Sequence, residues 1–71
     1  MIKKIKITNH SEYVLRDTTI GKVYDVTVHE KGSLDINNIT CIHETICLIN
    51  DDGDHVAFWV KDNCYEVVEE D

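Results

Sequence analysis

The chain lacks proline altogether, which removes prolyl isomerisation as a slow step in its folding. It has no apolar stretch near the roughly 18 residues of a membrane helix, and its opening, "MIKKIKIT", has no apolar run of signal-peptide length. Its three cysteines form an odd and sparse set, whereas secreted disulfide scaffolds carry even and denser sets. We therefore expect a cytoplasmic protein with reduced thiols and no membrane partner.

Basic residues are also scarce, with 7 Lys and Arg against 14 Asp and Glu and a net charge of −7. Residues 1–31 hold six bases and four acids, whereas residues 32–71 hold ten acids and one base, Lys61. Nucleic-acid binding needs clustered Lys and Arg, so this balance disfavours a nucleic-acid partner even though lysines gather near the start. An acidic surface suits a basic protein partner, or serves solubility alone.

The length and composition indicate one small domain over residues 1–71. A hydrophobic fraction of 42% is ordinary for a globular chain. A domain of this size buries only about 60% of its unfolded surface, so its stability is marginal. Small domains gain stability by burying an edge or an exposed aromatic in a second copy, which makes a homodimer a partner to consider.

Alternation of apolar and polar residues is typical of half-buried strands. We expect about five short strands, near residues 2–8, 23–28, 41–50, 55–60 and 65–70. In the second strand Tyr24, Val26 and Val28 share the apolar face, which we place inward. The run 41–50 is apolar on both faces, as in a strand covered on both sides. The stretch "SLDINNIT" at 33–40, within the long variable segment 32–45, indicates a loop, with one helical turn as the alternative.

A small barrel is the architecture that these short antiparallel strands favour, because closure removes exposed sheet edges. The stretch "DDGD" at 51–54 separates two strand-like runs and predicts a hairpin turn, with Gly53 free to take a positive φ. We expect an all-β fold, a small SH3-like barrel.

Three blocks of sequence support this fold by resemblance: "TIGKVYDV" at 19–26, "LINDDGD" at 48–54 and "YEVVEE" at 65–70. Together they resemble small SH3-like β-barrel proteins of bacteriophage and prophage. The resemblance implies a phage-type accessory protein that acts by binding another protein, host or phage, and that modulates a host factor. The chain departs from the pattern between Gly32 and Thr45.

Metal binding and catalysis have weak signatures. Placing Gly53 at the sixth position of an EF-hand loop puts Trp59 where the twelfth-position glutamate belongs, so the template fails. Cys41, His43, Cys47 and Cys64 are zinc-type ligands, but their spacing is not that of a zinc knuckle. Buried free thiols are the simpler explanation. We expect no cofactor, no metal and no enzymatic activity.

Interface candidates remain. Trp59 alternates with Phe58, so it points outward as an anchor or packs under the long loop. We add Tyr24 and the acids Asp51, Asp52 and Asp54. The alternative function is an acidic DNA-mimic inhibitor of a host nucleic-acid-binding protein, in which these acids join the later ones in a row of charge.

Overall fold

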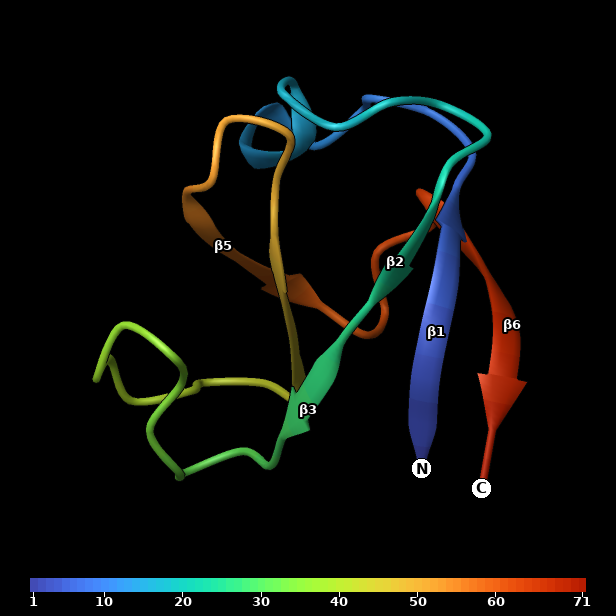
Figure 1. Cartoon of the computed structure of the whole chain (residues 1–71). Coiled ribbons are helices and arrows are strands. Elements are labelled where there is room, and N and C mark those ends of the chain that lie inside the picture. Colours follow the sequence, from blue (N-terminus) through green and yellow to red (C-terminus); the bar gives the residue numbers. More distant parts are fainter.

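The computed structural model describes all of residues 1–71 and contains two three-stranded antiparallel sheets (Figure 1). The first sheet has the order β2-β1-β6 and the second has the order β3-β4-β5. A short 3-10 helix, η1, lies between β1 and β2. The element bounds are β1 Ile2–Ile7, η1 Tyr13–Leu15, β2 Val23–Asp25, β3 Thr27–His29, β4 Thr45–Ile49, β5 His55–Trp59 and β6 Tyr65–Glu70.

One extended segment joins the two sheets. The predicted strand 23–28 is present, but Val26 interrupts it, and its two halves pair with different neighbours. β2 pairs with β1, whereas β3 pairs with β4. At the interruption, the N–H of Val26 donates to the carbonyl of Lys3 at 3.0 Å. The segment thus passes from one sheet into the other, as Figure 1 shows.

The barrel predicted from the sequence is not closed, although the all-β fold is confirmed. β5 and β6 do not pair with each other. Side chains bridge that gap instead: the Tyr65 hydroxyl donates to the Val60 carbonyl at 2.6 Å, and the Phe58 and Tyr65 rings meet edge to face at 5.8 Å. β5 therefore has no strand partner at its second edge, which we call its free edge, although η1 packs near this strand.

The core lies between the sheets, and its residues follow the predicted alternation. Tyr24 is buried and Val26 and Val28 are partly buried, so the inward face of the second strand is confirmed. The buried core cluster consists of Ile5, Ile7, Leu15, Tyr24, Ile46, Leu48, Phe58 and Cys64.

β4 is covered on both faces, as its sequence predicted. Its first four residues, 45–48, are all buried. Ile46 and Leu48 face the core. On the other face Cys47 is 1% exposed, and the loop of residues 30–44 (the β3–β4 loop) lines one hollow together with Thr45. The loop has no helical turn; a bridge between Leu34 and Thr40 closes it.

Candidate functional site

The turn at 50–54 is organised by an asparagine rather than by the aspartates. The hairpin itself is confirmed, because β4 and β5 pair antiparallel on either side of it. The Asn50 side-chain oxygen accepts the N–H groups of Asp52 at 3.0 Å and Asp54 at 2.9 Å. Gly53 has φ +84°, which explains the glycine. Asp52 and Asp54 project into solvent without an ion pair.

Asp51 ties the hairpin to the segment before β2. Its two carboxylate oxygens accept the Thr19 hydroxyl at 2.6 Å, the Lys22 ammonium at 2.7 Å and the Tyr24 hydroxyl at 2.8 Å. The backbone adds a further link, since the Asp51 N–H donates to the Asp17 carbonyl at 3.1 Å. Four strong contacts on one residue indicate a structural tether.

The ionised form of Asp51 is favoured by these contacts. The Lys22 ammonium, followed by the Thr19 and Tyr24 hydroxyls, lowers the pKa of this carboxyl from 3.8 to about 2. The same pair raises the pKa of Lys22. The segments 19–26 and 48–54 thus meet at Asp51.

Tyr24 is buried, so the structure does not offer its ring as a surface anchor. Only 7% of the residue is exposed. Its hydroxyl accepts the Thr19 N–H at 2.8 Å and donates to Asp51. The structure therefore places Tyr24 and Asp51 in one internal network and leaves Asp52 and Asp54 apart from it.

Trp59 lies half-buried at the end of β5. This position is intermediate between the two alternatives left by the sequence, an outward-pointing anchor and a ring packed under the long loop. Its ring packs edge to face against His43 of the β3–β4 loop, with 4.4 Å between ring centroids. The Lys61 ammonium lies 4.9 Å from the ring centroid. Asp62 then holds both backbone groups of Trp59: its carboxylate accepts the Trp59 N–H at 3.0 Å, and its own N–H donates to the Trp59 carbonyl at 2.9 Å.

A groove follows β5 on both sides of Trp59. One hollow, of about 480 Å³, lies between the β3–β4 loop and β5 and is lined in part by Ile39 and Ile42. A second, of about 280 Å³, lies beside β5 and η1, with Glu12 and Asp62 at its margin. Both hollows share Val14, Ala57, Phe58 and Trp59, so we treat them as one β5 groove.

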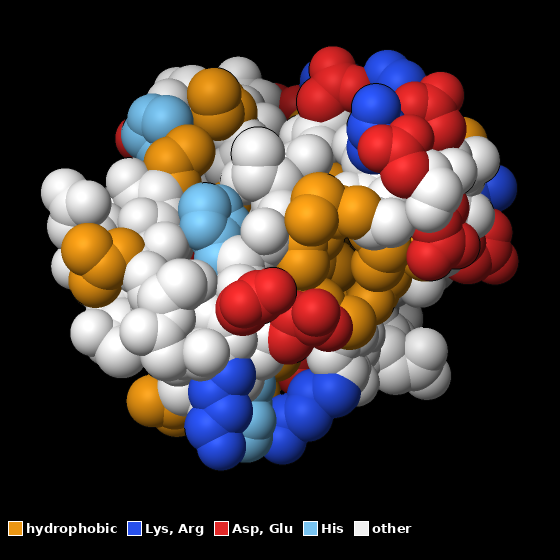
Figure 2. All heavy atoms as spheres, turned by 90° about the horizontal axis from the view of Figure 1, so that it is seen from below, with side chains coloured by type: hydrophobic (Ala, Val, Ile, Leu, Met, Phe, Trp, Pro, Cys, Tyr) orange, Lys and Arg blue, Asp and Glu red, His pale blue; other side chains and the backbone are white.

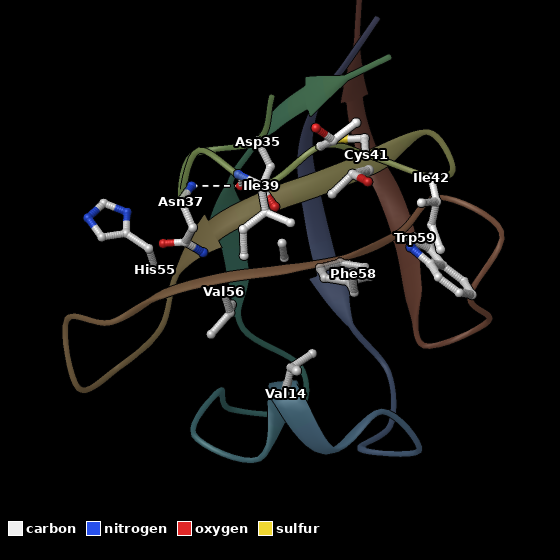
Figure 3. Close-up of a pocket in the computed structure, with 13 residues that line it drawn as sticks. Val14, Asp35, Asn37, Ile39, Cys41, Ile42, His55, Val56, Phe58 and Trp59 are labelled. Carbon is white, nitrogen blue, oxygen red and sulfur yellow. Dashed lines mark hydrogen bonds between the residues drawn. The ribbon is translucent and has the colours of Figure 1, made fainter. Parts of the chain in front are cut away.

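Figure 3 shows how the groove is built. Val14 lies on one side of β5, and Ile39 and Ile42 lie on the other. His55 and Trp59 stand at opposite ends of the strand. An apolar groove with a few polar groups is the usual form of a binding site.

The cysteines are free and buried, which agrees with their interpretation as small apolar core residues. Burial raises the pKa of the Cys47 thiol, and it raises the pKa of the Cys64 thiol to about 11, with smaller contributions from Asp62 and Glu12. No three His, Cys, Asp or Glu side chains come together as a metal site, so Cys41, His43, Cys47 and Cys64 are not gathered around one point.

Part of the acidic charge is paired with bases, and three of the unpaired acids share one hollow. Each ion pair neutralises one acid; the pairs are Lys3–Asp71, Lys4–Asp25, Lys6–Glu66, Arg16–Asp17 and Lys22–Asp51. Figure 2 shows acidic side chains beside hydrophobic ones on the face seen from below. A hollow of about 240 Å³ near the chain termini has Glu30, Glu44 and Glu70 around an apolar floor.

Sequence reasoning missed several residues of the β5 groove. Val14 lies between the first two predicted strands, Ile39 lies in the predicted loop, and Ile42 lies in the predicted strand 41–50, of which only 45–49 forms β4; all three are exposed. Large apolar side chains outside the regular strands were the available signal in the sequence, because exposed apolar patches often mark interaction surfaces. Asp62 gave no signal in the sequence, because aspartate is ordinary in a turn such as "KDNCY" at 61–65.

Comparison with known proteins adds no relative. Neither protein-family models, nor curated proteins, nor solved structures gave a match to this chain. No helix in the structure has the length and apolar character needed to cross a membrane.

Proposed function

We propose that this protein is a non-enzymatic binding protein that recognises another protein through the β5 groove, and that it serves as a phage-type accessory factor acting on a host protein. The groove carries the first part of the proposal. The second part is supported by the sequence blocks at 19–26, 48–54 and 65–70.

Exposed apolar side chains gather around the groove. Ile39 and Ile42 are each 62% exposed, and Val14 on the opposite side is 38% exposed. Trp59, which is partly buried, lines both hollows. Apolar residues that remain in water next to an aromatic anchor are typical of protein interfaces.

Asp35 and Cys41, two residues of the groove that could in principle serve as base and nucleophile, have structural roles, which supports binding rather than catalysis. One Asp35 carboxylate oxygen accepts the backbone N–H groups of Asn37 at 2.7 Å and Ile39 at 3.1 Å, so it shapes the β3–β4 loop. Cys41 is buried, with 5% exposed. A nucleophile needs an adjacent base and access to substrate, and neither residue has this arrangement.

The DNA-mimic alternative has less support. Mimicry requires free charges spaced along one face. The charge of Asp51 is neutralised by Lys22, which leaves only Asp52 and Asp54 of that group available.

A capture experiment from bacterial lysate tests the proposed function. Trp59→Ala and Ile42→Ser should each reduce the captured partner by about ten-fold or more, because groove anchors dominate binding. Val68→Ser is the matched control for Ile42→Ser, since Val68 is 51% exposed but lies on β6 of the other sheet. Circular dichroism confirms that each variant folds.

The proposal fails if the groove variants capture the partner as well as the native protein does. The mimic alternative gains support instead if Asp52→Asn together with Asp54→Asn abolishes capture, and if capture also weakens steeply with salt.

A further inference from the structure

The free edge of β5 runs along the groove, and its hydrogen-bonding direction follows from its pairing with β4. Val60 donates its N–H to the Glu44 carbonyl at 2.9 Å, and Phe58 is paired with Ile46. Backbone groups alternate in direction along an antiparallel strand. The N–H and C=O groups of residues 55, 57 and 59 therefore point away from β4.

These outward groups are not all available. Asp62 occupies both groups of Trp59. Ala57 and His55 have no hydrogen-bond partner for their outward backbone groups. The strand thus presents the free backbone donors and acceptors of two residues, His55 and Ala57, which both line the β5 groove.

The charged side chains that line the hollow beside this edge are both acidic. Glu12 and Asp62 line the same hollow as Ala57, and neither forms an ion pair. The whole chain carries a net charge of −7. A second copy would bring an equal negative charge to the edge, whereas a basic segment would complement it.

We propose that the partner contributes an extended segment containing Lys or Arg, which adds as a further strand to the free edge of β5. This rests on the proposed function and specifies its partner class. Its backbone pairs with Ala57 and His55, which supplies affinity by strand addition. A side chain on one face of the segment packs against Val14 and Trp59, and a basic side chain reaches Glu12 and Asp62.

Amide chemical shifts of the labelled protein test this inference with defined peptides. The probe is a blocked peptide of about nine residues that alternates valine and lysine, a length suited to one strand. One comparison peptide carries N-methyl groups on alternate backbone amides, and another carries glutamate in place of lysine. The lysine peptide should shift Ala57 and His55 and bind at least about ten-fold more tightly than either comparison peptide.

Protein variants provide an independent arm. Proline is tolerated on an edge strand where the N–H faces solvent, so Ala57→Pro should fold and lose peptide binding. Glu12→Gln with Asp62→Asn should weaken binding several-fold at low salt, because asparagine still accepts the Trp59 N–H but lacks the charge. The matched control, Glu69→Gln with Glu70→Gln, removes the same charge from β6 and should leave binding unchanged.

Several results would overturn the inference. These are no binding of the lysine peptide, equal binding of the N-methylated or glutamate peptide, shifts confined to other strands, or self-association through β5 without peptide. If Ala57→Pro does not fold, the N-methylated peptide still decides the question. If Trp59-dependent capture from lysate persists while the peptide test fails, the proposed function stands and only the strand-addition inference falls.

Discussion

Replacing isoleucine with valine at one position on each face of β4 compares a core position with a surface position through the same chemical change. Ile46 is 0% exposed and Ile49 is 52% exposed. Replacing Ile46 with valine removes one fully buried carbon and leaves a small cavity, which costs about 1 kcal/mol. The same change at Ile49 removes a carbon that is roughly half in water, so we expect a cost below about 0.5 kcal/mol.

Urea unfolding followed by circular dichroism measures both free energies of unfolding. A domain of this size has a total stability of about 4 to 11 kcal/mol, so the Ile46→Val change is detectable. With a slope of about 1 kcal/mol per molar urea, the midpoint should fall by about 1 M for Ile46→Val and by less than about 0.5 M for Ile49→Val. Valine and isoleucine have similar strand propensity, so burial is the main difference.

Equal losses at the two positions, or a larger loss at Ile49, would refute the assignment of the inner face of β4. Trp59 fluorescence provides a second probe, and coincidence of its transition with the circular dichroism curve tests whether unfolding is two-state.

Three further predictions concern acid stability, thiol reactivity and the hairpin turn. Because the pKa of Asp51 is held at about 2 against an ordinary 3.8, its stabilisation is present above about pH 4 and is lost as the pH falls towards 2. Urea unfolding across that range should show that the free energy of unfolding falls less steeply with decreasing pH for Asp51→Asn than for the native protein. The same pH dependence in both proteins would contradict the structural role of Asp51. Cys64, with a pKa of about 11, should react with iodoacetamide at pH 8 only as the protein unfolds, and rapid labelling of the native protein at Cys64 would refute its burial. Gly53→Ala should lower the free energy of unfolding by about 1 kcal/mol because of the positive φ, and Gly53→Asn by less; thermal unfolding compares them, and no loss with alanine would argue against that turn.

Local patterns account for the part of the fold that the sequence predicted. Ile5 and Ile7 alternate with lysines, and both are fully buried in β1. The period of two is a property of neighbouring residues, so it can be recognised without tertiary information. The absence of pairing between β5 and β6 could not be predicted from the sequence, because barrel closure depends on how these two strands are placed in the tertiary structure.

The candidate site also combines features that local sequence predicts with features that only tertiary contacts determine. Nothing near Asp51 in the sequence indicates that Lys22, which is 29 positions away, neutralises its charge. The burial of Tyr24 was predictable from its apolar face, but its hydrogen bond to Asp51 was not. Trp59 could not be assigned to surface or core, because its exposure depends on where the β3–β4 loop places His43.

The most direct test of the central claim is an amide chemical-shift map of the labelled protein with its captured partner. Binding through the β5 groove predicts the largest changes at Ala57 and Trp59, with further changes around Val14 and Ile42. Changes concentrated at 51–54 or along β6, with β5 unaffected, would contradict the account.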